Sequence, residues 1–429
     1  MNKALKERID TIHQDPSAVH YVKTEIGILP CDWEVAKLSD IAEQVTQTAG
    51  TDYYETVSIS AGIGFVNQAK KFGKELSGKQ YEKYNVIHKG DFSYNKGNSN
   101  KYPQGCIYRL KDRETAAVPN VFESFKIQSE YADFYDHLFV SGFLNQQLSK
   151  KINHGVRDNG LLNLTEKDFY SCLLPVPPLA EQKKISKILS HYDKLIKLCE
   201  AKFNEYKSLK KICLSKIFPQ NSSNVPELRF PGFTGAWEQR KLSDEFSDFI
   251  VPMRDKPKEF GGNIPWTRIE DIKGKYLNGS LSGQFVSEET IKQMNLKIIP
   301  KDSLIVSSSA TFGVAAIITQ DLITNQTFIG LVPKDKDTLD FWYTFFHSAE
   351  ARNYMRLQSA GSTIFYIARE HFEKMPIKVP TKDEMFKIGK YFSDIDRLIT
   401  LHQREVEEYT RLKKAMTQLL LTGIVRVNT

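Results

Sequence analysis

The stretch Trp33-Glu-Val-Ala-Lys-Leu-Ser-Asp40 recurs 204 residues later as Trp237-Glu-Gln-Arg-Lys-Leu-Ser-Asp244, with six of eight positions identical. A second match joins residues 169–196 to residues 372–399, with 11 of 28 positions identical at an offset of 203 residues. Two offsets that agree within one residue indicate a tandem duplication. The interiors of the copies, residues 41–163 and 245–366, show little resemblance. One scaffold is therefore expected to present two different surfaces.

Each copy ends in a long predicted helix, at residues 179–218 and 381–422. Apolar residues recur there at alternating spacings of four and three, which is typical of a coiled-coil seam. Each helix is about 57 Å long at 1.5 Å per residue. Lys210 and Lys413 interrupt the two seams at equivalent positions. We expect the seams to face each other antiparallel; the alternative is that each helix packs on its own copy.

The seam residues expected to meet are apolar or aromatic: Ile185, Leu189, Tyr192, Ile196, Phe203, Tyr206, Ile388, Phe392, Ile395, Ile399, Val406 and Tyr409. Cys199, Cys213 and His402 share their phase. The cysteines are expected to act as small hydrophobic residues, and His402 as an interface histidine rather than a metal ligand. No metal site is expected.

The remaining segments predict two mixed α/β (α+β) domains. Short strand-like runs include residues 55–60, 106–110, 303–307 and 313–319, and amphipathic helices are expected at residues 135–152 and 341–357. The expected divisions, in chain order, are an N-terminal segment (1–25), a first domain (26–178), a long helix (179–218), a linker (219–231), a second domain (232–380), a long helix (381–422) and a tail (423–429).

Motifs for catalysis are absent from the 429 residues. The sequence contains no GxxxxGK[ST] phosphate loop, no HExxH zinc motif and no GxSxG nucleophile elbow. The tetrapeptides that position a base amine in adenine methylases are also absent. No apolar run approaches the roughly 18–20 residues that a membrane-spanning helix needs. The five cysteines form no CxxC pair, so a reducing cytoplasm is the simplest compartment. We expect a non-catalytic protein.

Positive charge is concentrated in one part of the chain. Residues 66–113 contain eleven basic and four acidic residues, an excess equal to the net charge of +7 for the whole chain. Residues 181–218 contain ten lysines against four acids, whereas residues 382–421 are nearly balanced, eight against seven. Lysines interleaved with aromatic and amide side chains indicate nucleic-acid binding, with lysines on phosphates and Asn or Gln on base edges. The alternative is an ordinary solvated face rich in lysine.

The second domain offers a comparable place at residues 301–313, which align roughly with the stretch that begins at Lys89. A strand there runs into a loop of Ser, Thr and Gly, which would supply hydroxyl donors; an ordinary Ser-rich turn is the alternative. The residues expected to contact DNA are Lys70, Lys71, Lys74, Tyr94, Lys96, Asn98, Asn100, Lys101, Tyr102, Arg157, Arg254, Ser308, Ser309 and Thr311. No catalytic residue is expected.

The whole pattern resembles the specificity subunit of type I restriction–modification systems. The resemblance lies in residues 24–38, in residues 226–238, and in Val176-Pro-Pro-Leu-Ala-Glu-Gln-Lys-Lys-Ile185, which opens the first long helix. It covers essentially the full chain, and the motifs are specific because they occur in duplicate. The second helix opens with Val379-Pro-Thr-Lys-Asp-Glu-Met-Phe-Lys-Ile388, which departs from the usual Leu-x-Glu-Gln form.

The resemblance implies two target recognition domains, each reading one half of a bipartite, asymmetric DNA sequence, with the paired helices fixing the gap. It implies two methyltransferase subunits that use S-adenosylmethionine to methylate adenine N6, and motor–nuclease subunits that use ATP and Mg²⁺. No cofactor is expected in this chain. Two alternatives remain open: a fused restriction–methylation enzyme, and a two-headed coiled-coil scaffold that does not bind DNA.

Overall fold

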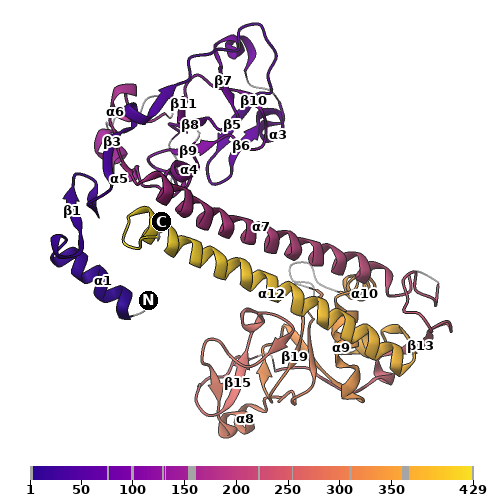
Figure 1. Ribbon diagram of the computed structural model, residues 1–429. Helices are drawn as coiled ribbons and strands as arrows, with labels where there is room; N and C mark the ends of the chain where they lie inside the picture. The colour runs from indigo at the N-terminus through magenta and orange to yellow at the C-terminus, as the bar shows by residue number, and fades with distance from the viewer. Residues whose placement is uncertain are drawn as a thin grey trace. The chain divides into compact units, whose positions relative to one another are not determined.

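A computed structural model describes residues 3–74, 77–97, 101–127, 130, 132–152, 161–220, 223–253, 255–308, 312–359 and 367–427. The chain divides into two compact units. Unit 1 comprises Met1–Lys197 with Val406–Thr429, and unit 2 comprises Leu198–Glu405. The division falls within the two long helices, so each unit contains a part of both (Figure 1).

The two long helices are α7 (Leu179–Lys216) and α12 (Lys382–Leu421). They have 38 and 40 residues and carry acidic side chains in their first turns, where the helix dipole favours negative charge. The first ends three residues before Pro219 and the second two residues before Gly423. The two long helices expected from the sequence are therefore present in the fold.

In both units the two helix segments pair antiparallel. In unit 1, Ile185 near the start of α7 shares a hydrophobic core with Leu420 at the end of α12. In unit 2, Ile388 near the start of α12 shares a core with Cys213 and Ile217 near the end of α7. Each of these cores also contains residues of the adjoining domain, so both arrangements considered from the sequence occur together. The first turns of each helix pack on their own copy and on the other helix.

The central sheet of unit 1 has four antiparallel strands in the order β4-β11-β8-β9. The strands are β4 (Ala42–Gln44), β11 (Glu123–Ile127), β8 (Phe92–Asn95) and β9 (Cys106–Arg109). Phe92 and Phe125 face each other across β8 and β11, with stacked rings whose centroids are 5.4 Å apart. Helix α4 (Ala132–Val140) buries most of its side chains, and Phe139 packs edge-on against both rings.

Smaller sheets and helices complete unit 1. An antiparallel hairpin of β5 (Val57–Ser60) and β6 (Gly64–Asn67) leads into α3 (Gln68–Phe72). Strands β7 (Asn85–His88) and β10 (Thr115–Val118) pair beside it, and Val57, Ile87 and Val118 share a small core. The N-terminal part contains α1 (Lys3–Gln14) and a hairpin of β1 (Tyr21–Thr24) and β2 (Gly27–Pro30).

Unit 2 repeats the strand order of unit 1 although the sequences diverge. Its five-stranded sheet has the order β14-β21-β18-β19-β16, formed by β14 (Phe246–Ile250), β21 (Phe328–Pro333), β18 (Leu304–Ser307), β19 (Ala315–Ile318) and β16 (Tyr276–Leu277). The first four strands correspond in order to β4, β11, β8 and β9, and only the added β16 pairs in parallel. A second sheet combines β17 (Phe285–Val286), β15 (Ile264–Thr267) and β20 (Ile323–Thr324). The mixed α/β architecture is therefore confirmed in both units.

The repeated sequence builds the same small sheet in each unit. In unit 1, β3 (Glu34–Lys37) pairs antiparallel with β12 (Leu173–Val176). In unit 2, β13 (Glu238–Lys241) pairs with β22 (Pro376–Val379) in the same way. The residue after β3, Leu38, donates its N–H to the carbonyl of Cys172, and Leu242 donates to the carbonyl of Met375. The identical residues of the duplication thus form the base from which each long helix begins.

The two predicted amphipathic helices each break into a pair. Residues 135–152 contain α4 and α5 (Asn145–Lys151), separated at Gly142, which adopts a φ of +80° that ends the first helix. Residues 341–357 overlap α9 (Leu339–Phe346) and α10 (Ala349–Gln358). Ser348 separates the second pair, because its side chain accepts a hydrogen bond from the N–H of Ala351 and starts a new helix. Short helices α6 (Glu166–Tyr170) and α11 (Arg369–Glu373) follow in units 1 and 2.

Two further facts bear on the type of protein. All five cysteines are free. Within the described ranges, none of the helices has the length and apolar character required to traverse a bilayer.

Candidate nucleic-acid interface

The two loops singled out from the sequence follow equivalent strands. The loop after β8 begins at Lys96, and the loop after β18 begins at Ser308. Strands β8 and β18 occupy the same place in their sheets, between β11 and β9 in unit 1 and between β21 and β19 in unit 2. The rough sequence alignment of these segments is therefore confirmed. Two loops of different amino-acid composition therefore follow the same strand of the shared sheet.

In unit 1 the β8–β9 loop lies beside the tip of the β5–β6 hairpin. The N–H of Gly62 at the tip donates to the hydroxyl of Tyr108 on β9, at 2.8 Å. A Cβ at Gly62 would lie 3.0 Å from the hydroxyl oxygen of Tyr102. Lys71 of α3 reaches back to the carbonyl of Ile59 on the hairpin, at 3.3 Å. The structure thus brings Lys71 and Tyr102 to neighbouring elements, and Lys70 shares the helix of Lys71.

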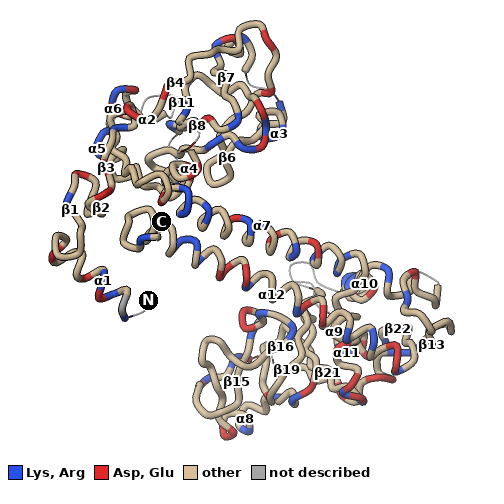
Figure 2. Tube along the Cα trace, viewed as in Figure 1, with Lys and Arg blue, Asp and Glu red and all other residues tan. Residues whose placement is uncertain are grey.

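Ion pairs divide the basic residues of this region into two groups. Five are paired with carboxylates: Lys89 with Glu114, Lys96 with Glu123, Arg109 with Asp133, Lys111 with Asp136, and Arg113 with Glu55 and Asp112. The exposed lysines 70, 71, 74, 79, 83 and 101 have no acidic partner within the described part of the chain. The second group therefore supplies the excess positive charge. Figure 2 marks the positions of all described lysines and arginines in blue along the chain.

Burial keeps the neighbouring titratable groups neutral. It raises the pKa of the Tyr108 hydroxyl to about 12, and it raises the pKa of the Cys106 thiol to about 11 although the charge of Lys71 opposes this. Both side chains are therefore uncharged near neutral pH. Lysine side chains set the sign of the charge beside β9, which is the sign that attracts phosphate.

Two of the predicted contact residues have structural roles instead. Tyr94 is fully buried; its ring stacks on Phe169 at 4.7 Å, and its hydroxyl donates to the carbonyl of Gln104 at 2.7 Å. The prediction for Tyr94 is therefore wrong in this structure, because an aromatic side chain on the inner face of β8 belongs to the core. Lys96 is held by Glu123, and its side chain is only 14% exposed.

Several predicted residues fall outside the described residues: Asn98, Asn100, Arg157, Arg254, Ser309 and Thr311. Of the others, Lys70, Lys71, Lys74 and Lys101 are exposed and Tyr102 is half-buried. Ser308 is buried, with its N–H bonded to the carbonyl of Thr327 and its carbonyl accepting from Ile367. Ser308 therefore anchors its loop to the adjacent segment.

In unit 2, backbone hydrogen bonds connect the loop after β18 with the segment between β20 and β21, and that segment with the end of β15. The N–H of Ser308 donates to the carbonyl of Thr327 at 2.8 Å, and the N–H of Asn325 donates to the carbonyl of Thr267 at 3.3 Å. Gln326, between these two residues, is exposed. Sequence reasoning missed this segment, although a polar run of Asn, Gln and Thr between the apolar strands β20 and β21 was a visible signal. Its amides are suited to hydrogen bonding with base edges.

A basic and aromatic cluster next to β15 was also missed. Lys256 lies 5.3 Å from the ring centroid of Phe260 and 5.8 Å from that of Trp266. The guanidinium of Arg268 lies 5.5 Å from the Trp266 ring; its Nε is 4.0 Å from a carboxylate oxygen of Glu270 and has no hydrogen-bond partner among the described residues. Cations held over aromatic rings keep donors available for a further acceptor. The cluster lies next to the strand end that carries Thr267.

A buried carboxylate closes the base of each unit. In unit 1, Glu181 on α7 accepts hydrogen bonds from Trp33 Nε1 at 2.9 Å and from two nitrogens of Arg426 at 2.8 and 2.7 Å. In unit 2, the equivalent Glu384 on α12 accepts from two nitrogens of Arg229 at 2.7 and 2.8 Å. Both carboxylates are fully buried. Each arginine follows the end of one long helix and binds the start of the other.

Comparison with known proteins identifies the family. The family model described as the type I restriction modification DNA specificity domain matches residues 30–207 and 236–411. The chain belongs to this family. The two matched segments coincide with the two copies of the duplication, each ending in its long helix.

Relatives carry the same family description, and a solved structure shares the fold. A putative type I restriction enzyme MjaX specificity subunit of Methanocaldococcus jannaschii is 24% identical over 96% of this chain and 97% of its own. The EcoprrI specificity subunit of Escherichia coli is 32% identical over 35% of this chain and 37% of its own. A crystal structure of the type I restriction–modification S subunit of M. genitalium matches with a TM-score of 0.50 and 12% identity over 92% of this chain and 97% of its own. The structural match supports the fold alone.

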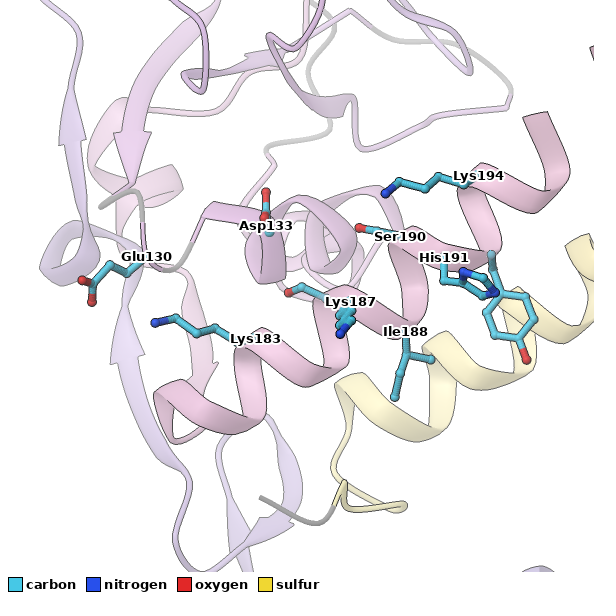
Figure 3. Close-up of a pocket in the computed structure, with 10 residues that line it drawn as sticks. Glu130, Asp133, Lys183, Lys187, Ile188, Ser190, His191 and Lys194 are labelled. Atoms are coloured by element: carbon cyan, nitrogen blue, oxygen red, sulfur yellow. The ribbon is translucent and has the colours of Figure 1, made fainter. Parts of the chain in front are cut away.

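The specificity-domain chain also has a hollow of 760 Å³ beside α7 in unit 1 (Figure 3). Lysines 183, 187 and 194 on α7 line it, together with Glu130, which precedes α4, and Asp133 in the first turn of α4. Ser190 also lines the hollow, and its Oγ lies 3.1 Å from Nε2 of His137 on α4, at hydrogen-bond distance. The mixed charge of the hollow fits a protein surface better than a phosphate backbone, because the two carboxylates would repel phosphate.

Proposed function

We propose that this specificity-family chain recognises DNA for a type I restriction–modification complex and that each unit reads one half of a bipartite, asymmetric target. The observation that carries the proposal is the shared strand order of the two units with unlike loops after β8 and β18. A common scaffold with different loops allows the same docking geometry while the bases read differ. Phosphate contacts position such a domain, and base contacts specify its site.

The two units are proposed to grip DNA differently. Unit 1 uses the exposed lysines of α3 and the β8–β9 loop, chiefly Lys70, Lys71 and Lys101, against phosphates. Unit 2 uses the polar segment around Gln326, with Lys256 and Arg268 beside it. A lysine-rich surface gives strong salt dependence, whereas amide side chains give base discrimination with a smaller salt effect.

The paired helices are proposed to set the gap between the half-sites and to dock methyltransferase subunits. Support for docking comes from exposed apolar side chains on the helices within unit 2: Leu198, Leu209, Ile212, Phe386 and Leu401. Single exposed apolar residues are common, but a concentration on two paired helices favours a protein partner. The hollow beside α7 in unit 1 offers that partner a mixed-charge surface. S-adenosylmethionine, ATP and Mg²⁺ would be held by the partner methyltransferase and motor–nuclease subunits, which direct adenine N6 methylation or cleavage.

An exchange of recognition domains tests the proposal. The complex of this chain with its partners is expressed in a host, and the methylated sites are read by methylome sequencing. Replacing residues 41–163 with the interior of another family member should change one half-site and leave the other unchanged. A change in both half-sites would contradict modular reading. Methylation or cleavage of DNA by the purified chain alone would instead support the fused-enzyme alternative.

A second measurement separates DNA recognition from the scaffold alternative. Affinity of the purified chain for duplex DNA should fall steeply between about 50 and 200 mM salt, because bound lysines release condensed counterions. Affinity that is absent, or independent of salt, would favour a scaffold that binds only proteins. For docking, Leu198→Glu and Ile212→Glu should weaken binding of the methyltransferase subunit while leaving DNA affinity of the free chain unchanged.

A further inference from the structure

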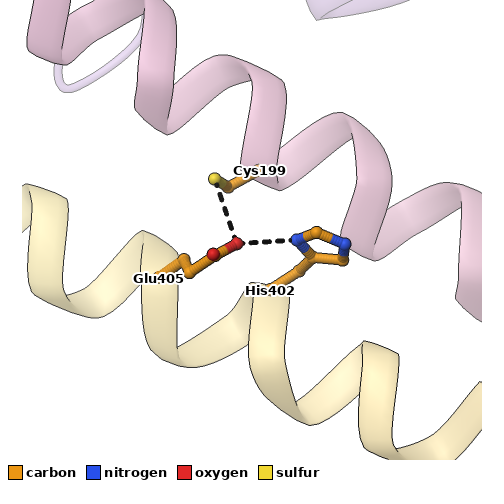
Figure 4. A group of neighbouring side chains, drawn as sticks. All are labelled: Cys199, His402 and Glu405. Atoms are coloured by element: carbon orange, nitrogen blue, oxygen red, sulfur yellow. Dashed lines mark hydrogen bonds and ion pairs between the residues drawn. The ribbon is translucent and has the colours of Figure 1, made fainter.

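A cysteine, a histidine and a glutamate from the two long helices meet in unit 2 (Figure 4). Cys199 lies on α7, and His402 and Glu405 lie on α12. One ligand atom from each lies within 4.8 Å of the others. Glu405 Oε2 is 2.8 Å from His402 Nδ1 and 3.5 Å from Cys199 Sγ. We propose that these three side chains form a Zn²⁺ site that joins the two helices.

The distances are close to those of a tetrahedral zinc site. With bonds of about 2.0–2.2 Å to nitrogen and oxygen and about 2.3 Å to sulfur, neighbouring ligand atoms lie about 3.3–3.6 Å apart. The observed separation of Cys199 and Glu405 is already in this range, and a small side-chain rotation separates His402 from Glu405. Thiolate, imidazole and carboxylate together suit Zn²⁺ better than Mg²⁺ or Ca²⁺, which prefer oxygen ligands. Water would occupy the fourth position.

The helices explain how the ligands converge. His402 and Glu405 are three residues apart, so they project from one face of α12. Cys199 and His402 occupy equivalent positions of the two copies, 203 residues apart. Antiparallel pairing brings equivalent positions together near the middle of the seam, so a cysteine in one copy and a histidine in the other become neighbours. Metal sites between helices are commonly built from such facing positions with ligands three residues apart.

The surroundings favour a cation at this point. Elsewhere on the seam an acidic side chain forms an ion pair with a lysine of the facing helix, as Asp396 does with Lys210. Within the described residues, the carboxylate of Glu405 contacts His402, and no lysine or arginine joins it. The ring of Tyr206 stacks on His402, with centroids 5.6 Å apart and an angle of 7° between the planes, and fixes the imidazole orientation. Without metal, two hydrogen-bond donors share one carboxylate oxygen.

Metal binding replaces a proton. Burial first, and then the hydrogen bond to Glu405 and its charge, raise the pKa of the Cys199 thiol, so the thiol carries its proton in the metal-free state. Zn²⁺ takes the thiolate, and the proton leaves to solvent. His402 binds through Nδ1 with its remaining proton on Nε2, and Glu405 binds as the carboxylate.

Zinc stoichiometry of the purified full-length chain tests the site. Protein stripped with a chelator is dialysed against excess Zn²⁺ and then against metal-free buffer, and bound zinc is measured by mass spectrometry. The wild type should retain about one Zn²⁺ per chain, and Cys199→Ser and His402→Ala should each retain less than about a tenth of this. Cys213→Ser is the matched control, because Cys213 is a buried α7 cysteine that contacts Tyr391 rather than a histidine.

Cobalt provides a second readout that does not depend on stability. Co²⁺ added to the wild type should give a thiolate-to-metal charge-transfer band that Cys199→Ser lacks and Cys213→Ser keeps. Circular dichroism of the stripped proteins establishes that the variants keep their helices. Wild type without retained zinc would show a hydrogen-bonded interface triad only. Equal retention in Cys199→Ser would place the metal elsewhere; either result overturns the proposal.

Discussion

Lys210 on α7 forms an ion pair with Asp396 on α12, with 2.6 Å between Nζ and Oδ1. The equivalent residues of the other copy form the same pair in unit 1, where Lys413 on α12 lies 2.5 Å from Asp193 on α7. The lysines that interrupt the apolar seam at the same point of both copies therefore each meet an aspartate of the facing helix. The interruption is a specific interhelical contact in each unit.

Replacing Lys210 by Met should destabilise unit 2 by about 1 kcal/mol, because the side chain of Asp396 is only 23% exposed and loses its cation. Urea unfolding followed by circular dichroism measures the loss. The exposed neighbour Lys211→Met is the matched control and should be neutral. The exchange Lys210→Asp with Asp396→Lys should recover most of the stability. Failure of the exchange to recover stability would contradict a charge-based role.

Arg426→Ala should destabilise unit 1 by about 3 kcal/mol or more, because it leaves the fully buried Glu181 carboxylate without its cation. Arg426→Lys should recover little, since an ammonium cannot make the two parallel hydrogen bonds of the guanidinium. Arg411→Ala on the exposed face of α12 is the control. Thermal and urea unfolding measure the effect, and equal stabilities of the two alanine variants would show that Glu181 does not depend on Arg426.

Acid should weaken each unit through a buried histidine. Burial lowers the pKa of His137 in unit 1 and of His347 in unit 2 below the usual histidine range. The unfolded chain then binds protons that the folded chain does not. Stability is therefore retained above the unfolded-state pKa and lost as pH falls toward the folded-state pKa. When the pH is lowered from about 7.5 to about 5.5, the urea concentration at the unfolding midpoint should decrease less for His347→Gln than for the wild type. The exposed control His191→Gln should show the same decrease as the wild type.

Charge reversal of Lys70 and Lys101 should weaken binding to all DNA sequences and reduce the slope of affinity against salt by about one for each phosphate that is no longer neutralised. Lys89→Glu serves as a control for added negative charge, because Lys89 is already paired with Glu114. Fluorescence anisotropy with specific and unrelated duplexes measures both quantities. A loss of affinity confined to one base position would indicate that these lysines contact bases rather than phosphates.

Gly105→Ala should disturb the β8–β9 loop and, with it, reading of one half-site. Gly105 has a φ of +75°, and a Cβ there would lie 2.3 Å from the carbonyl oxygen of Asn95 and 2.7 Å from the ring of Tyr94. Neither atom can move away, since one is backbone and the other is packed in the core. We expect weaker specific binding with little change in non-specific affinity. Gly50→Ala, with nothing within 4 Å of the added carbon, controls for backbone strain at positive φ.

The repeat and the helices were predictable because each rests on a periodic signal. The offset of Trp33 from Trp237 located the base sheets, and the spacing of apolar residues located α7 and α12. The alignment of residues 301–313 with the stretch from Lys89 related β8 to β18, but the rest of the common strand order was not predictable, since the remaining strands of the two domain interiors show little resemblance. The error at Tyr94 has another origin: in a short strand, an aromatic residue next to polar ones gives no sign of which face it occupies. The triad of Cys199, His402 and Glu405 depends on residues 206 positions apart in sequence, and only pairing of the helices brings them together.

Unit 1 is formed by two segments that are far apart in the sequence, and this affects how the chain can fold during translation. Unit 2 is continuous, so all of its residues have left the ribosome once Glu405 has emerged. Unit 1 needs Leu420 and Leu421 for its core and Arg426 for Glu181, although most of its chain is made first. Folding of unit 1 therefore cannot be completed until more than two hundred further residues have been translated, and part of its apolar surface stays exposed during that time. Chaperone binding to stalled nascent chains should accordingly concentrate on the domain that is synthesised first and completed last.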